Sequence, residues 1–265
     1  MPKLSVTVIT RDEGANLAAA LDSVAWADEI VVVDSESTDA TVAIARRYTD
    51  RIVVRPWPGY VAQKNHAASA AAHDWILSID ADERVSPELA RAIRALMAQE
   101  PPAAGYRLPR VTFHLGRWIR TTDWYPDYQL RLYDRRRGRW TGTHVHESVQ
   151  VDGPVVDLAS ELQHLAYRDV SHHLQTMDRY SSLAAAEMRE RNRTAGWADL
   201  ALHPPAAFLR NYVLRGGFRD GVPGLIISLM NAAYVALKFA KLWELCSHST
   251  STPPAPGAAD NSKSS

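Results

Sequence analysis

The side chains best suited to chemistry are two carboxylates, Asp80 and Asp82, which stand two positions apart at the end of an apolar run. The run covers residues 74–79 and reads DWILSI, a pattern that predicts a buried strand. Carboxylate oxygens are hard ligands for divalent cations, and ligands of open α/β sheets collect where strands end. The spacing therefore predicts a site in which a divalent cation meets a diphosphate.

A purely structural role for the two carboxylates stays open. A helix is expected to begin near Ser86, followed by Pro87 and Glu88, and acidic residues just ahead of a helix often cap its first turn. The Asp-x-Asp pattern is also short enough to arise by chance. The choice between the two readings depends on the rest of the chain.

The first third of the chain alternates between strand-like and helix-like segments. Strands are predicted at residues 4–10, 29–34, 51–55 and 74–79, and helices at residues 15–25, 38–48 and 61–72. This alternation predicts an α/β fold with a mostly parallel sheet and helices on both faces. Thr10, Asp34 and Asp80 all end strands, so we expect them at one edge of the sheet.

The middle of the chain changes character after a predicted helix at residues 86–98 and a Pro101-Pro102 break. Short strands are predicted at residues 106–115, 128–133 and 155–164, and this half is expected to form the acceptor side. Between residues 107 and 139 there are nine arginines against three acidic residues. An anionic partner would suit this segment, although an ordinary solvated basic surface explains it as well.

The last third predicts three helices, at residues 170–193, 205–215 and 225–245. We therefore expect a catalytic domain over residues 1–165 and a helical region over residues 166–246. Residues 247–265 are rich in Ser, Pro and Ala without apolar periodicity, which predicts a disordered tail.

Composition narrows the classes of function. The chain has 265 residues, 46% of them apolar, and 30 basic residues against 30 acidic ones, so nothing favours nucleic-acid binding. The single Cys246 excludes an intramolecular disulfide, and the first residues show no signal-peptide pattern, so a cytoplasmic location is expected. The uncharged stretch 221–237 is interrupted and short for a membrane span, so it is not expected to cross a membrane.

Four segments are informative because of their order and spacing: SVTVIT at 5–10, VVVDSESTDAT at 31–41, QKN at 63–65 and SIDADE at 78–83. In this order and spacing they resemble the inverting family 2 glycosyltransferases of the GT-A fold. RLY at 131–133, VHE at 145–147 and His164 narrow the resemblance to bacterial lipopolysaccharide core β-1,4-glucosyltransferases. The resemblance spans about residues 3–245 and implies a Rossmann-like sheet followed by a C-terminal helical extension.

The resemblance implies a nucleotide-sugar donor held at the strand ends. It assigns Thr10 to the donor site, Asp34 to the base or ribose, Lys64 to the phosphates, and Asp80 to the ribose or the water shell of the metal. Arg131 is expected near a phosphate of donor or acceptor. Ordinary roles stay open: Lys64 can be a surface lysine, while Thr38 and Asp39 are better explained as a helix start and loop support.

For the metal, the resemblance implies magnesium or manganese bound directly by Asp82, with His164 completing the protein ligands. A histidine between leucines is otherwise often a core residue, and Glu83 is expected to point elsewhere. Inversion needs a base for the acceptor hydroxyl. The family usually supplies an Asp or Glu from a Glu-Asp pair. This chain has His146-Glu147 instead, which leaves the base open.

Glu147 is the favoured base, Asp127 is the runner-up, and His146 would orient Glu147. A salt bridge between Glu147 and an arginine is the structural alternative. Five aromatic residues could stack on sugar rings or simply pack in the core: Trp118, Trp124, Tyr125, Tyr128 and Trp140.

The reaction expected from the resemblance moves glucose from UDP-glucose to an anionic glycolipid, the lipopolysaccharide inner core. Transfer to a polyprenyl phosphate, or an inactive scaffold that only binds a nucleotide sugar, are the alternatives. The sugar, the acceptor linkage and the oligomeric state are not encoded in any pattern we can read.

The last predicted helix also raises the question of a membrane surface. Its apolar positions can form one stripe with arginines and lysines nearby, which favours an interfacial helix at the inner face of the cytoplasmic membrane. Packing against the rest of the protein explains the same stripe. Its members are Leu225, Ile226, Leu229, Ala233, Ala236, Leu237, Ala240 and Leu245.

Overall fold

The computed structural model describes residues 1–142 and 147–247. The chain forms two compact units that divide between Arg168 and Asp169. The predicted tail, residues 247–265, falls almost entirely outside the described residues. The two units are described separately below.

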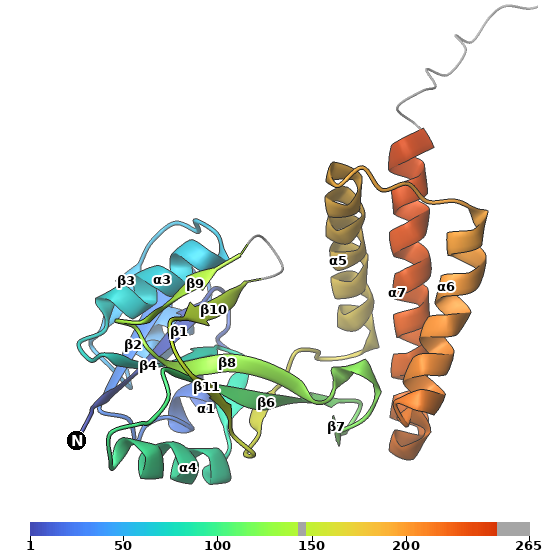
Figure 1. The fold of residues 1–265 in the computed structure, drawn as a ribbon. Helices are drawn as coiled ribbons and strands as arrows, with labels where there is room; N and C mark the ends of the chain where they lie inside the picture. The colour runs from blue at the N-terminus through green and yellow to red at the C-terminus, as the bar shows by residue number, and fades with distance from the viewer. Residues whose placement is uncertain (143–146, 248–265) are drawn as a thin grey trace, which may run out of the picture. The chain divides into compact units, whose positions relative to one another are not determined.

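Four parallel strands form one half of the sheet in the first unit (Figure 1). They are β1 (Leu4–Thr10), β2 (Glu29–Asp34), β3 (Ile52–Val54) and β4 (Trp75–Asp80), in the order β3-β2-β1-β4. Every residue of β1 is buried, as expected for a strand covered on both faces. Thr10 pairs with Asp34 and Ile9 with Asp80, so the three predicted strand ends do lie together.

The other half of the sheet is mixed. Strand β8 (Asp127–Asp134) runs antiparallel to β4, and β6 (Gly105–His114), β12 (Leu162–His164) and β5 (Glu83–Val85) continue the sheet. Two further strands, β7 (Arg117–Ile119) and β11 (Val155–Asp157), pair with β6, and a short 3₁₀ turn spans Thr122–Trp124. A separate two-stranded sheet joins β9 (Gly138–Thr141) and β10 (Ser148–Val151).

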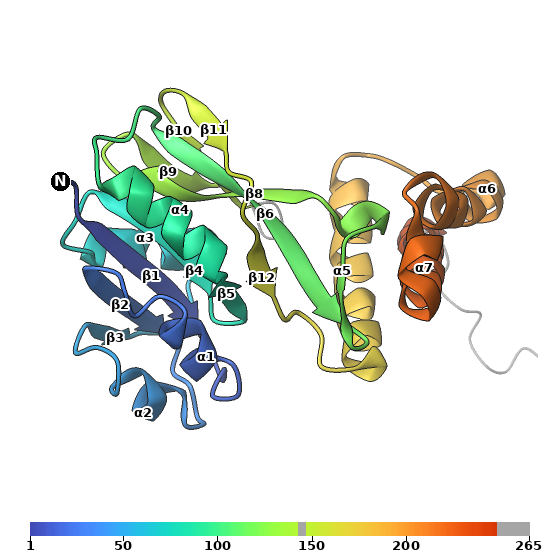
Figure 2. The same cartoon turned by 90° about the horizontal axis from the view of Figure 1, so that it is seen from below.

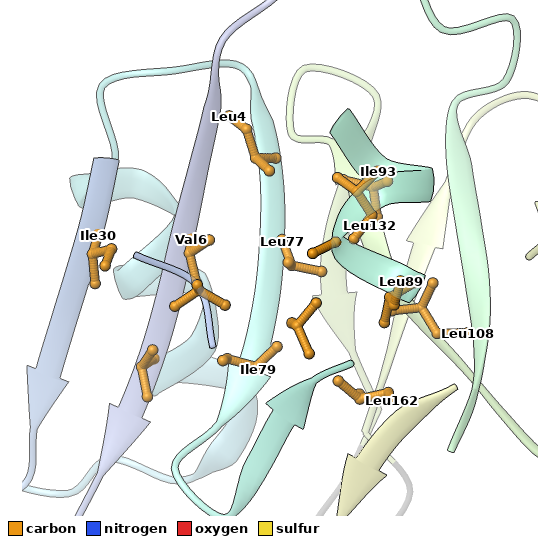
Figure 3. Packing of buried hydrophobic residues seen from close by; sticks show 14 of the residues in the cluster. Leu4, Val6, Ile30, Leu77, Ile79, Leu89, Ile93, Leu108, Leu132 and Leu162 are labelled. Atoms are coloured by element: carbon orange, nitrogen blue, oxygen red, sulfur yellow. The ribbon is translucent and has the colours of Figure 1, made fainter. Parts of the chain in front are cut away.

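Helices cover both faces of the sheet, as the sequence predicts. On one face, α1 (Leu17–Asp22) and α4 (Pro87–Met97) pack on residues such as Val6 and Leu77 (Figure 3). On the other face, α3 (Tyr60–Ala70) and Trp140 of β9 cover Ile76 and its neighbours. The short α2 (Thr41–Ala45) follows β2. The GT-A type of sheet expected from the resemblance is therefore present.

The second unit is a three-helix assembly. It contains α5 (Val170–Glu190), α6 (Trp197–Leu209) and α7 (Gly221–Ser247), with a π-helical turn at Arg210–Leu214 and a 3₁₀ turn at Gly217–Asp220 between the last two (Figure 2). Phe239 and Leu242 of α7 are buried with Ala185 of α5.

Several predicted boundaries are wrong. The second C-terminal helix begins at Trp197 rather than at residue 205, and Pro204 and Pro205 lie inside it. Proline usually breaks a helix, but Asp199 accepts a hydrogen bond from the Gly196 amide and fixes an earlier start. The predicted strand 155–164 is two strands, and the short β5, β7, β9 and β10 were not predicted.

The last helix is longer than the sequence suggested. Helix α7 has 27 residues, and together with the preceding 3₁₀ turn it is long and apolar enough to cross a membrane by length and composition. The length argument made for residues 221–237 is therefore wrong, while the expectation that they do not cross a membrane stays a prediction. Glycine and proline at its start do not end the helix, because they lie in its first turn, where proline needs no hydrogen-bonding amide.

Candidate active site

The loops after β1 and β2 are tied to each other at the strand ends. The Asp39 carboxylate accepts hydrogen bonds from the backbone amides of Thr41 and Gly14, and from the Thr41 hydroxyl. The hydrogen bonds from Thr41 lower the pKa of Asp39. Asp12 accepts a hydrogen bond from the Thr38 amide at 2.7 Å. Asp39 thus supports the loop, as the sequence predicted.

Thr10 and Asp34 are both buried at this edge. Both oxygens of the Asp34 carboxylate already have partners, because they accept hydrogen bonds from the amide and the hydroxyl of Ser37. The Thr10 hydroxyl, by contrast, has no hydrogen-bond partner among the residues that the structure describes. A buried hydroxyl without a partner is costly unless something else completes it.

Asp80 is the centre of the site and is flanked by two buried cations. Nζ of Lys64 on α3 donates a hydrogen bond to Oδ2 of Asp80 at 3.4 Å and lies 3.0 Å from Oδ1, and Arg131 of β8 donates to Oδ2 at 2.7 Å. Lys64 and Arg131 are only 2% and 3% exposed. Burial alone would raise the pKa of Asp80, but the charges of Arg131 and Lys64 hold it far below its ordinary value.

Glu83 supports this centre from behind, so the expectation that it points elsewhere is wrong. Its Oε1 atom accepts hydrogen bonds from Arg131 at 2.8 Å and from Arg110 at 3.1 Å, and its Oε2 atom accepts one from the Asp80 amide at 2.9 Å. The Glu83 side chain is fully buried. Burial disfavours the charge of Arg131, yet Asp80 and Glu83 raise the pKa of Arg131, so it stays cationic.

Asp82 and His164 face each other beside this centre. Nε2 of His164 lies 3.3 Å from Oδ2 of Asp82, and β12 holds the histidine because it pairs with β5 and β6. Burial raises the pKa of Asp82, but the hydrogen bond and charge of His164 outweigh it and lower the pKa. Within residues 1–142 and 147–247, no group of three or more His, Cys, Asp or Glu side chains is arranged to hold a metal ion.

One acidic residue near Asp82 was missed by the sequence reasoning. Burial raises the pKa of Glu13, and the nearby negative charge of Asp82 adds to this effect. Glu13 follows β1 by three positions and begins the turn that leads into α1. The sequence signal that could have found Glu13 is its position just after a predicted strand end, the same signal that points to Thr10, Asp34 and Asp80.

The two candidate bases have different surroundings. Oε1 of Glu147 lies 3.8 Å from Nζ of Lys64, a long ion pair, and the carboxylate is about one-fifth exposed. Asp127 instead accepts two hydrogen bonds from Arg110 and one from Gln129. Lys64 pairs with both Glu147 and Asp80, so Glu147 lies near Asp80. Asp127 instead forms a salt bridge with Arg110. His146 lies outside the described residues.

The five aromatic residues differ in burial: Trp140 is buried, Tyr128 is exposed, and the other three, Trp118, Trp124 and Tyr125, are partly exposed. Trp140 is buried, with the Lys64 ammonium 4.3 Å and the Arg131 guanidinium 5.5 Å from its ring centre. Trp124 stacks on Tyr167 at 5.4 Å, and Trp118 packs edge-on against Phe113. Packing thus accounts for Trp140, which covers the two cations of the site.

Most of the arginine-rich segment is paired within the protein, which weakens its reading as an anion-binding surface. At least six of the nine arginines hydrogen-bond or ion-pair to carboxylates or carbonyl oxygens of the first unit. They are Arg107, Arg110, Arg120, Arg131, Arg135 and Arg136.

Comparisons with known proteins point in one direction. The profile of glycosyl transferase family 2 matches residues 5–151. A lipopolysaccharide core biosynthesis glycosyltransferase, LpsC of Rhizobium meliloti, is 31% identical over 253 residues, which covers 92% of this chain and 94% of the relative. An uncharacterized glycosyltransferase of Rickettsia felis is 32% identical over 258 residues, covering 92% of this chain and 90% of the relative.

A solved structure extends the likeness to the fold. The mannosyltransferase PcManGT from Pyrobaculum calidifontis, in complex with GDP-Man and Mn²⁺, superimposes with a TM-score of 0.54 at 15% identity. The match covers 92% of this chain and 88% of that protein. At this identity the likeness concerns the fold alone.

Proposed function

Because the chain belongs to glycosyltransferase family 2, we propose that it transfers glucose from UDP-glucose to the inner core of a lipopolysaccharide, with inversion and with a divalent metal. The observation that carries the proposal is the arrangement around Asp80, which lies between Lys64 and Arg131 at a strand end. A carboxylate at a strand end can accept hydrogen bonds from ligand hydroxyl groups and Lys64 beside it can balance phosphate charge, while Arg131 fixes the carboxylate. The relative LpsC supports the choice of a lipopolysaccharide acceptor.

The residues present fit a substrate-bound metal. Magnesium usually binds one or two protein carboxylates, several waters and the substrate phosphates, so a site of two protein ligands is sufficient. Asp82 and His164 offer one carboxylate oxygen and one imidazole nitrogen at 3.3 Å from each other, and both are partly exposed. Magnesium or manganese held there would neutralise charge on the leaving diphosphate.

Asp34 and Thr10 would hold the nucleoside. Asp34 ends β2 with a carboxylate buried beneath the loop, and the partnerless hydroxyl of Thr10 offers a donor and an acceptor to a bound ligand. Lys64, beside Asp80, would balance phosphate charge. Arg131 is held by both Asp80 and Glu83, so we assign it to fixing Asp80 rather than to reaching the substrate.

Glu147 would act as the general base. It would take the proton from the acceptor hydroxyl while the acceptor oxygen attacks the anomeric carbon and the bond to the diphosphate oxygen breaks, which inverts that carbon. Lys64 would orient Glu147 through their ion pair. Asp127 is less suited because Arg110 and Gln129 already occupy both of its oxygens.

A donor panel with purified full-length protein tests the proposal. We expect glucose release or transfer from UDP-glucose that depends on manganese and is lost in Asp82→Asn. The Glu147→Gln variant should lose about 100-fold or more in turnover, because a general base contributes about that much, yet bind UDP with unchanged affinity. Glu100→Gln changes an exposed residue and serves as the matched control.

Three results would each reject a part of the proposal. Near-normal turnover of Glu147→Gln would remove Glu147 as the base, and transfer from another nucleotide sugar alone would reject glucose. Offering a heptose-containing lipid acceptor and a polyprenyl phosphate in parallel decides the acceptor. Activity on the polyprenyl phosphate alone would reject the lipopolysaccharide core.

A further inference from the structure

The joint between α6 and α7, residues 209–222, carries an exposed apolar surface on the second unit. Its large apolar side chains are between 52% and 79% exposed. Five exposed large apolar side chains within residues 209–222 are unusual, because on most protein surfaces such side chains are exposed singly. The members are Leu209, Val213, Leu214, Phe218 and Val222.

The backbone of the joint has a defined and tightly packed structure. Its backbone turns from α6 through a π-helical turn and a 3₁₀ turn into α7, and Gly216 adopts the left-handed conformation with φ of 69°. A side chain at Gly224 would collide with the Gly217 carbonyl oxygen at 1.8 Å, so the start of α7 packs directly against the turn. The buried Asn211 amide donates a hydrogen bond to the Ala207 carbonyl oxygen. The apolar side chains are therefore presented outward by a well-packed backbone.

Positive charge is interleaved with this apolar surface. Three exposed arginines, Arg210, Arg215 and Arg219, outnumber the one acidic residue of the joint, the buried Asp220, and Arg210, Arg215 and Asp220 each also interact with other groups of the protein. Apolar side chains surrounded by arginines suit the headgroup region of an anionic bilayer, where the apolar groups enter the boundary and the arginines meet phosphate. A second copy of the joint would instead bring arginines against arginines.

The stripe expected on α7 is less suitable for a membrane. Leu229 is exposed, but Leu225, Ile226 and Leu245 are partly covered, since α7 packs between α5 and α6. Nζ of Lys241 lies within 2.6–2.8 Å of four oxygens of α5, which fixes this part of α7 inside the helix assembly.

We propose that the α6–α7 joint is a docking surface for an anionic membrane, with Leu214 and Phe218 inserted between headgroups and the arginines bound to lipid phosphates. The surface would keep the enzyme at the inner face of the cytoplasmic membrane, where a lipid-linked acceptor is found. In that respect alone the inference rests on the proposed function. Vesicle binding needs neither donor nor acceptor, so it can fail while sugar transfer succeeds, and the reverse.

Vesicle flotation with the full-length protein tests the proposal. We expect binding to vesicles of phosphatidylglycerol and phosphatidylcholine, weak binding to phosphatidylcholine alone, and release at high salt. The double variant Leu214→Asp, Phe218→Asp should bind at least about tenfold more weakly, since it places charge where insertion occurs. Leu202→Asp, an equally exposed leucine of α6 outside the joint, is the matched control and should bind normally.

A second variant guards against misfolding, because Arg215→Ser with Arg219→Ser leaves every apolar side chain in place. It should lose the preference for phosphatidylglycerol while its circular dichroism spectrum stays unchanged. Normal vesicle binding by both double variants would overturn the proposal, as would binding that resists alkaline extraction, which would mark α7 as a membrane span. Self-association that Leu214→Asp abolishes, without vesicle binding by the wild type, would make the joint a contact between copies and also overturn it.

Discussion

At the scale of single residues, the site depends on a carboxylate that is not expected to touch substrate. Glu83 joins the Asp80 amide, Arg131 and Arg110, so it fixes the orientation of the groups nearest to the proposed donor. In a fully buried position, removing one partner of such a network leaves the other charges unbalanced.

Replacing this carboxylate with its neutral isostere should therefore be costly. We expect Glu83→Gln to lower the free energy of unfolding by about 3 kcal/mol, because the two guanidinium groups would lose a buried counter-charge. Urea denaturation measures the change. Glu88→Gln removes an exposed pair with Arg91 and should change stability by less than about 0.5 kcal/mol. Equal effects of both substitutions would show that Glu83 is not the anchor.

The sequence could place Glu83 beside Asp80 but could not show its partners. Arg131 and Arg110 are 48 and 27 residues away from Glu83 along the chain. They reach it only because β8 and β6 pair with a register shift between Tyr106 and Arg107. Strand ends are a local signal, whereas the cations that meet there are set by long-range register.

At the scale of elements, helix α3 and the short strand β9 together fix the surroundings of Lys64. Asn65 of α3 donates to the Trp140 carbonyl oxygen at 2.9 Å and accepts from the Trp140 amide at 3.0 Å. This reciprocal pair holds β9 against α3, and Trp140 in turn covers Lys64. Asn65 thus links the position of α3 to the environment of Lys64, the lysine that we propose to bind the donor.

Removing the side-chain amide of Asn65 should weaken the attachment of β9 to α3. We expect Asn65→Ala to lower the free energy of unfolding by about 2 kcal/mol, since each net hydrogen bond contributes about 1 kcal/mol, and to raise the KM for the sugar nucleotide. Thermal unfolding and initial rates measure the two effects. Ser69→Ala, on an exposed position of the same helix, should leave both unchanged. An unchanged KM with lowered stability would show that Lys64 is placed without help from β9.

The turn from β8 to β9 predicts a dependence on pH. Burial raises the pKa of Asp134, but the hydrogen bonds and charge of Arg136 outweigh it and lower the pKa below the ordinary 3.8. A lowered folded-state pKa stabilises the protein above the unfolded-state value, and this stability is lost as pH falls through the folded-state pKa.

The Asp134→Asn variant isolates this contribution. Its deficit in melting temperature relative to wild type should be largest at neutral pH and should shrink as pH falls below 3.8. Scanning calorimetry of both proteins over this range measures it. A deficit that does not change with pH would mean that Asp134 acts through packing and not through its charge.

The elements that the sequence predicted well are those with strong apolar patterns. Strands β1 and β2 have the predicted bounds because buried parallel strands read as continuous Val and Ile runs. The short β9 and β10 were missed, since four residues carry too little pattern. The start of α6 was missed because Pro204 and Pro205 suggest a helix start, while the actual start depends on Asp199.

At the scale of the whole molecule, the chain combines a family catalytic unit with a helical one. The family profile ends at residue 151, yet the alignment with LpsC covers 92% of the chain and so extends well into the helices. The sequence predicted helices there from their periodicity. It could not show which apolar faces stay exposed, because packing among α5, α6 and α7 decides that.

The chain divides into two compact units between Arg168 and Asp169. We therefore expect a loss of stability inside the helical unit not to spread to the first unit. Lys241 ties α7 to α5 through Asp178, Ser181 and Ser182. We expect Lys241→Ala to destabilise the helical unit by about 2 kcal/mol, because hydrogen bonds to a charged group contribute about that much. Hydrogen exchange should accelerate in α5 and α7 but not in β1 and β4.

Mass spectrometry of deuterium uptake resolves these segments in one experiment, with UDP binding as a second readout for the catalytic unit. Arg189→Ala removes an exposed cation of α5 and should leave exchange in both units unchanged. Faster exchange in β1 or β4 of the Lys241 variant, or weaker UDP binding, would contradict independent units. In that case the helices would support the donor site as well as carrying the proposed membrane surface, since loss of local stability spreads only through elements that unfold together.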